Sequence, residues 1–260
     1  MRQTCDNCGR ALTGPFCSAC GQKAHALNPT LGDVVHDATH ELLHVDGRIF
    51  TSLHRLLLSP GFLTLEYFRG HRARWISPLR LYLTFSVLCF ALGVLPGSAN
   101  LRVGIDEART ETNAADRPAG FDSPEELADT VSEALQHRVP QAMFVLLPLF
   151  AFLVGIAFRK TGSNYPHHLY FALHVHAAWF AAAAVVVAIR AMTGDRVGRF
   201  LSMLAMFYAA WYFVRALRVV YGLSLGRTLL RAVAIAFLYW IAIIAATLAI
   251  VLPAVYWHSG

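Results

Sequence analysis

The sequence predicts an all-α integral membrane protein with about five transmembrane helices and a small cysteine-rich head at its N-terminus. Of its 260 residues, 56% are hydrophobic and only 15% are charged. Soluble domains carry about 25% charged residues, so one soluble core is a poor description of this chain. Long apolar runs occupy the second half, whereas four of the five cysteines lie within the first 20 residues.

Five apolar runs are candidates for membrane spans, because a helix needs about 20 residues to cross the hydrocarbon core. They cover Leu79–Leu95 and, roughly, 139–158, 167–191, 199–221 and 229–252. We therefore expect a first transmembrane helix at 78–95 and a four-helix transmembrane region at 139–260. The first and fourth runs are the shortest, and they reach the required length only if flanking arginines extend to the membrane surface.

Two polar segments separate the head from these runs and the first run from the rest. Residues 25–77 predict amphipathic juxtamembrane helices. Residues 96–138 are rich in acidic side chains and predict an extracytoplasmic stretch. Ser123-Pro124-Glu125-Glu126 is a capping box with proline at the first helical position, so a short amphipathic helix should begin there and lie on the membrane face or on neighbouring spans.

Arginine placement predicts the orientation. Arginines precede the first run and follow the second and fourth, as in loops that stay in the cytoplasm. This places the head inside and the C-terminus outside, although three residues oppose the rule: Arg190, Arg196 and Arg199. No signal peptide is visible, and lysine is scarce beside arginine. We expect a bacterial inner membrane and reduced thiols in the head.

The head, residues 1–24, has the ligand pattern of a zinc ribbon. Its cysteines form two C-x-x-C pairs, each followed by glycine: Cys5, Cys8, Cys17 and Cys20. Such turns present two sulfurs to one tetrahedral ion, and about 24 residues cannot fold on apolar burial alone. Four protein ligands leave no open position, which predicts structural zinc. Iron in the same geometry and two disulfides are the alternatives.

A second metal pattern follows at His40-Glu41-Leu42-Leu43-His44, on an expected helix from Thr30 to Val45. In metalloproteases two histidines one turn apart bind zinc and the glutamate activates water. The simpler interpretation is a histidine-rich, solvated helix face, because the motif has no distinctive third ligand. A zinc hydrolase using His40, Glu41 and His44 is therefore the less favoured hypothesis.

Basic residues beside the first run form a candidate binding site for anionic headgroups. Arg69, Arg72 and Arg74 lie close to Trp75, and each arginine near an anionic membrane surface contributes about 1 kcal/mol to binding. The expected partner of this segment is the lipid bilayer.

Histidines at the start of the third run are candidates for a polar membrane site: His167, His174 and His176, with His168 beside them. Ionisable residues at membrane depth often serve function. A proton relay, a haem or metal site, or a solute path are the functional interpretations. The structural interpretation is that these histidines form interhelical hydrogen bonds to Ser, Tyr or backbone. His167 and His168 are expected at the cytoplasmic membrane–water interface.

Residues 5 to about 90 resemble a bacterial family known as a domain of unknown function. The resemblance rests on the segment Phe16–Gln22, which reads Phe-Cys-x-x-Cys-Gly-Gln, and on the series Pro60-Gly61, Tyr67, Gly70-x-Arg72 and Pro78. It implies a four-cysteine zinc-ribbon head joined to several membrane spans, without an established reaction.

These observations favour a non-enzymatic membrane adaptor whose zinc head docks a protein partner or a second copy of the chain. The alternative is transport of a small solute, ion or proton through the bundle, using the third-span histidines. Few cations flank the cysteines, so nucleic acid is an unlikely partner.

Overall fold

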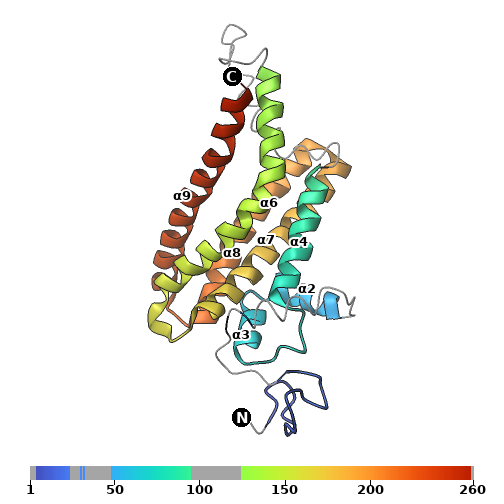
Figure 1. The fold of residues 1–260 in the computed structure, drawn as a ribbon, viewed down its shortest axis with the longest axis vertical. Coiled ribbons are helices and arrows are strands. Elements are labelled where there is room, and N and C mark those ends of the chain that lie inside the picture. The colour runs from blue at the N-terminus through green and yellow to red at the C-terminus, as the bar shows by residue number, and fades with distance from the viewer. Residues whose placement is uncertain (1–3, 24–29, 31, 33–47, 95–123, 259–260) are drawn as a thin grey trace.

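The computed structural model describes residues 4–23, 30, 32, 48–94 and 124–258. Within these residues the protein is all-helical, without β-strands, as Figure 1 shows. Its elements are α2 (Arg48–Leu58), α3 (Phe62–Phe68), α4 (Pro78–Val94), α6 (Pro124–Ala157), a 3-10 turn (Arg159–Thr161), α7 (Tyr165–Thr193), α8 (Asp195–Tyr221) and α9 (Leu225–His258). The head lies beyond one end of the helix bundle, and the C-terminus lies at the other end.

Four helices are long and apolar enough to cross a membrane, which makes this a membrane-type fold. The candidate spans are Asp129–Ala157, Tyr165–Thr193, Arg196–Tyr221 and Leu225–Trp257. By length, the structure therefore supports about four spans rather than the five predicted. The first predicted span forms α4, but this helix has 17 residues and falls short of the other four. The fourth predicted span does reach the length, because α8 continues through Arg215 and Arg218 to Tyr221.

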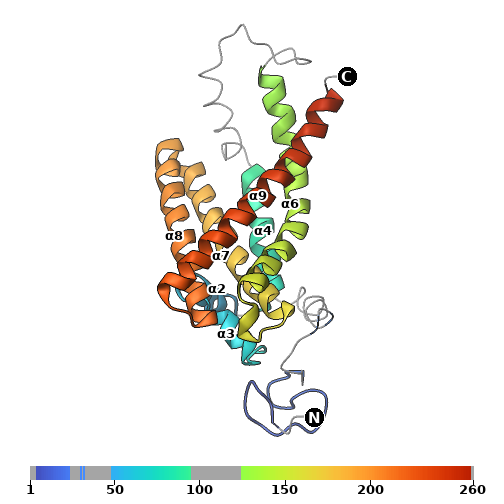
Figure 2. The ribbon, with the colours of Figure 1, turned by 90° about the vertical axis from the view of Figure 1, so that its left-hand side faces the viewer.

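The central element of the bundle is α7, which packs against α4, α6 and α8 and also contacts α2 and α3. Small residues allow this close approach: Ala172, Ala177 and Ala178 are fully buried. On the periphery, α9 packs mainly along α6. The α7–α8 pair and the α6–α9 pair separate toward the end remote from the head (Figure 2).

The helix that begins at Pro124 does not stop before the membrane. It continues without a break to Ala157, so the expected short helix and the second predicted span are one element, α6. Pro140 and Pro148 lie inside it. Proline removes one backbone donor but is tolerated in membrane helices whose neighbours supply hydrogen bonds. At this helix the Tyr165 hydroxyl donates to the Pro148 carbonyl at 3.0 Å and ties α6 to the start of α7.

Two short helices, α2 and α3, pack on the head end of the bundle. The Tyr208 hydroxyl of α8 donates to the Leu57 carbonyl of α2 at 2.8 Å. Leu63 and Tyr67 of α3 are buried in the same core as the long helices. The segment that contains α2 and α3 thus closes the head end of the bundle and positions the loop that contacts the head.

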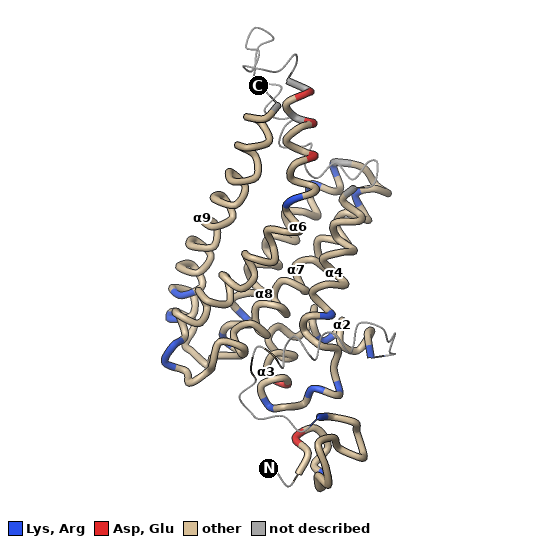
Figure 3. The backbone as a smooth tube through the Cα atoms, viewed as in Figure 1, with Lys and Arg blue, Asp and Glu red and all other residues tan. Residues whose placement is uncertain are grey.

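Charge is distributed unevenly between the two ends (Figure 3). Most lysines and arginines of the described residues lie at the head end or near it, whereas the acidic residues of α6 lie at the far end. Arg190, Arg196 and Arg199 lie toward the far end, in the last turn of α7 and the first turns of α8.

Candidate metal centre

The structure brings the four head cysteines to one point. Their sulfur atoms all lie within 4.8 Å of one another, with 3.6 Å between Cys5 and Cys20 and 3.5 Å between Cys8 and Cys17. A tetrahedral ion about 2.3 Å from each sulfur would hold the sulfurs about 3.8 Å apart. All five cysteines of the chain are free, so the disulfide alternative is not what the structure contains.

Two equivalent turns present these sulfurs. The Gly9 amide donates to the Cys5 carbonyl at 2.8 Å, and the Gly21 amide donates to the Cys17 carbonyl at 2.9 Å. Both glycines have positive φ, 74° and 71°, a conformation that costs other residues energy. Each turn is flanked by one isolated antiparallel bridge, Thr4 with Ala11 and Phe16 with Lys23. The head therefore consists of two similar turns, or knuckles, each of which presents two cysteines. The few residues between the two cysteine pairs leave no room for longer strands.

Backbone amides favour negative charge on part of this cluster. The Ala19 amide, and after it the Cys20 amide, lower the pKa of Cys17 to about 6. Desolvation raises the pKa of Cys20, but the Gln22 amide and the Asn7 side chain outweigh it, so that pKa is lowered. At Cys8 the Arg10 amide is outweighed by desolvation and the neighbouring thiols, and its pKa is raised to about 11.

This donor set fits a soft cation that accepts four thiolates. Cys5 and Cys17 are buried, and Cys8 is exposed at the rim, which gives an ion a route of entry. Because the protein supplies all four ligands, no position remains for substrate or water. The site can hold a metal and stabilise the head, and zinc and iron both suit four thiolates.

The residues of the other predicted metal site, His40, Glu41 and His44, lie outside the described residues. The hydrolase hypothesis that depends on them stays a sequence-based prediction.

The three candidate headgroup-binding arginines differ in position. The Arg69 side chain is 62% exposed and pairs with Glu66 at 3.3 Å, and Arg74 is exposed. For these two residues headgroup binding stays a prediction. Arg72 is only 8% exposed, and its guanidinium lies 5.6 Å from the centre of the Tyr170 ring. The loop turns this side chain into the bundle, where it packs on α7, and headgroup binding by Arg72 also stays a prediction.

The α7 histidines are all buried, including His167 and His168, which were expected at the interface. His168 Nδ1 lies 2.8 Å from the Tyr221 hydroxyl of α8. His174 Nδ1 lies 3.1 Å from the Thr64 hydroxyl of α3. His176 lies 3.0 Å from the Tyr239 hydroxyl of α9 and 2.9 Å from the Ala172 carbonyl. The bonds to Tyr221, Thr64 and Tyr239 are interhelical, as in the structural interpretation of this cluster, whereas the bond to Ala172 lies within α7.

The histidines do not converge on one ligand position. His167 packs edge-on against Phe68 of α3 with ring centroids 4.5 Å apart, whereas His176 contacts Phe150 of α6 at 4.9 Å. The tyrosine partners Tyr221 and Tyr239 were missed by sequence reasoning, since helical spacing gives the face of α7 but not which residue lies opposite.

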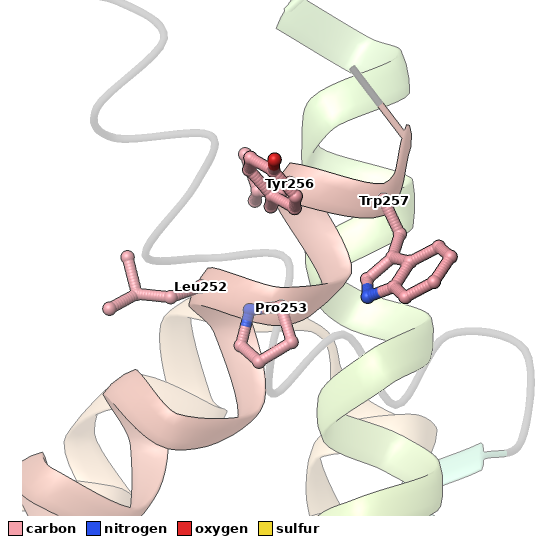
Figure 4. A pocket seen from close by; sticks show the side chains of 5 residues that line it. Leu252, Pro253, Tyr256 and Trp257 are labelled. Carbon is pink, nitrogen blue, oxygen red and sulfur yellow. The ribbon is translucent and has the colours of Figure 1, made fainter. Parts of the chain in front are cut away.

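A pocket at the end of α9 is lined by Leu252, Pro253, Val255, Tyr256 and Trp257. Figure 4 shows Tyr256 and Trp257 projecting on different sides of the helix. Both are exposed, at 78% and 84%, and all five lining residues belong to one helix. Aromatic side chains in such a position suit the membrane–water boundary, so we do not assign this pocket a ligand.

Glu66 is a further residue whose role the sequence did not predict. It is 6% exposed, and its carboxylate accepts from His71 Nδ1 at 2.9 Å and from Trp75 Nε1 at 3.4 Å. Burial raises its pKa, but the hydrogen bonds from His71, Trp75 and Arg69 outweigh burial and the pKa is lowered. Glu66 therefore organises the loop that follows α3.

Comparison with known families finds one match. Residues 46–90 match a family described as protein of unknown function (DUF3667). The matched segment covers α2, α3, the Glu66 loop and most of α4, and it does not include the four head cysteines. No curated protein matches the chain. No solved structure matches it either.

Proposed function

We propose that this chain is a bacterial inner-membrane adaptor whose helix bundle holds a structural zinc head in the cytoplasm, where the head docks a protein partner. One observation carries the proposal: four sulfurs lie within 4.8 Å of one another and leave a bound ion no open position. Such a site stabilises a surface rather than a reaction. Zinc is the proposed ion because paired C-x-x-C turns are its commonest structural ligands.

Charge distribution supports the orientation. Because the head and the start of α6 lie at opposite ends of the bundle, this orientation also requires the shorter helix α4 to carry the chain across the membrane. The helix ends and turns on the head side carry Arg159, Lys160, Arg227 and Arg231, whereas Glu126, Asp129 and Glu133 lie at the opposite end of α6. Positively charged loops remain in the cytoplasm during membrane insertion. A cytoplasmic head would also keep its thiols reduced, as metal binding requires.

Phe16 offers an anchor for the partner. It lies just before the second cysteine pair, and its aromatic side chain is 57% exposed. Exposed aromatic side chains on a rigid support often dominate binding energy at interfaces. A metal-bound head would hold Phe16 in one position and reduce the entropy lost on docking.

Site-specific crosslinking tests this function. A photoreactive phenylalanine analogue at position 16 of the full chain, expressed in cells, should capture one protein, and zinc removal should abolish the capture. The control position is Phe50 on α2, which is 79% exposed but outside the head. Capture at position 16 that persists without metal, or equal capture at position 50, would contradict the proposal. Capture of a second copy would identify the partner as the chain itself.

The transport alternative has less support. His168, His174 and His176 each have a hydrogen-bond partner on another helix, although Nε2 of His174 is buried without a partner among the described residues. These bonds give the three side chains a structural role that needs no solute. The adaptor function therefore remains the proposal.

A further inference from the structure

Gln22 of the head contacts the rest of the protein through its side chain. Gln22 follows the second cysteine pair and is 9% exposed. Its Nε2 donates to the Gly70 carbonyl at 2.7 Å, and its Oε1 accepts from the amides of Arg72 at 3.0 Å and Ala73 at 2.9 Å. One amide side chain thus pairs with three backbone groups of the loop after α3.

We infer that the Gly70–Ala73 loop is a docking site for the metal-bound head, and that Gln22 is the group it recognises. This inference rests on the proposed metal site. A side-chain carboxamide carries a donor and an acceptor side by side, and this loop uses both. Alanine at position 22 would break all three bonds and leave buried backbone groups without their partner.

The loop is shaped to receive the head. Gly70 has φ +86°, and a Cβ built on it would lie 2.9 Å from the Asp6 Cβ of the head. Separations below 3.0 Å do not occur between real Cβ contacts, so a side chain at position 70 would push the head away. Glycine is therefore needed here both for its backbone conformation and for the close approach of Asp6.

The loop holds its shape through its own contacts. Glu66 accepts hydrogen bonds from His71 and Trp75, and the Ile76 amide donates to the Ser52 hydroxyl of α2 at 3.2 Å. The His71 amide donates to the Glu66 carbonyl at 2.9 Å. None of these bonds involves the head, so the docking site should persist when the head is released.

Metal binding fixes the position of Gln22 for its contact with the Gly70–Ala73 loop. The Gln22 carbonyl accepts from the Cys17 amide at 2.8 Å, and Cys20 lies two residues before it. The backbone of Gln22 therefore belongs to the same turn that presents two of the sulfurs. Without an ion this short segment has too little apolar burial to fold, and Gln22 loses its fixed position. Docking should follow metal occupancy.

Docking would also connect the head with the membrane region. Arg72, whose amide bonds to Gln22, packs its guanidinium over Tyr170 of α7. Tyr67, three residues before Gly70, contacts both Tyr170 and His174, with ring centroids 5.5 Å and 5.6 Å apart. A docked head therefore rests on a loop that packs directly on the central helix.

Hydrogen exchange of the full chain in detergent micelles tests the inference. The reporter is the Ala73 amide, which donates to Gln22. With zinc bound, the wild type should protect this amide. A chelator, or Gln22→Ala with zinc still bound, should raise its exchange rate roughly tenfold, as expected for the loss of one hydrogen bond. The control variant is Thr13→Ala, at an exposed position of the head.

Metal content, measured in parallel, separates the two proposals. Wild-type protein without bound metal would overturn the zinc head itself. Unchanged Ala73 exchange in Gln22→Ala that retains zinc would overturn the docking site and leave the zinc head intact. If Gln22→Ala loses zinc, Gly70→Ala provides the test, since it alters only the loop. This variant should bind zinc and expose Gln22 to protease cleavage after Lys23, and continued protection there would refute the docking.

Discussion

The four cysteines of the head and the four histidines of α7 are each clustered in the sequence, but only the cysteine side chains meet at one point in space. The cysteine sulfurs all lie within 4.8 Å of one another. The histidines contact different helices: α3 for His167 and His174, α8 for His168 and α9 for His176. Ligands from two short turns can meet at a point, whereas side chains along one helix radiate from its axis.

This difference shows what holds each region together. The head is too small to fold on apolar burial and needs an ion. The α7 region is stabilised by close packing of small residues, with hydrogen bonds as a supplement. Loss of one cysteine ligand should therefore unfold the head, while loss of one histidine hydrogen bond should destabilise the α7 region only slightly.

The largest expected effect is that of Cys17→Ser. Changes to groups that merely orient metal ligands reduce affinity by about 10- to 100-fold, so loss of a ligand should exceed about a hundredfold and leave the head unfolded. Metal analysis and limited proteolysis of the purified protein measure both effects, and circular dichroism should show an intact bundle. Cys89→Ser, in α4 and away from the head, is the control. Equal metal content in the two variants would contradict a four-cysteine site.

A larger side chain in α7 should produce the next effect. Ala178 is fully buried, so Ala178→Leu should destabilise the bundle by about 1–3 kcal/mol through overpacking. Ala245 of α9 is exposed in the isolated chain and faces lipid if the bundle spans a membrane. Ala245→Leu should therefore have almost no effect. Thermal unfolding in detergent compares the two. Equal destabilisation would mean that α9 is covered by another protein or copy.

The histidine hydrogen bonds should contribute less. A double-mutant cycle of His176→Phe and Tyr239→Phe should give a coupling energy of about 0.6 kcal/mol, the average for membrane helices. Metal content should not change in any variant of the cycle. Loss of bound metal in His176→Phe would show that α7 carries a ligand and would remove the distinction between the two clusters.

The smallest effect concerns acid sensitivity of the loop between the two regions. The pKa of Glu66 is lowered in the folded protein. Its stabilising effect is therefore complete above the ordinary carboxyl pKa and disappears as the pH falls through the lowered value. The protection factor of the His71 amide, which removes the intrinsic pH dependence of exchange, should fall across that range in the wild type. In Glu66→Gln this protection factor should already be low and should not change with pH there. The same acid transition in both proteins would exclude Glu66 as its cause.

Sequence alone determined the features that depend on local spacing and on composition. The two C-x-x-C-Gly turns predict the sulfur cluster because each pair needs only a few residues to present both ligands. Apolar runs locate helices because hydrocarbon imposes a minimum length. Span ends were harder to predict, since Arg215 and Arg218 lie within α8, and no residue marks a break between the capping box at Ser123 and the apolar part of α6.

Tertiary structure alone decided which side chains meet. The partners of His168 and His176 are 53 and 63 residues away, and Gln22 reaches backbone groups 48 to 51 residues away. Periodicity indicates a face but not the element opposite it. Arg72 shows the same limit: its charge suggested contact with anionic headgroups, but the sequence did not indicate that its guanidinium lies over Tyr170. Long-range contacts depend on how all helices pack together, and no local pattern contains that information.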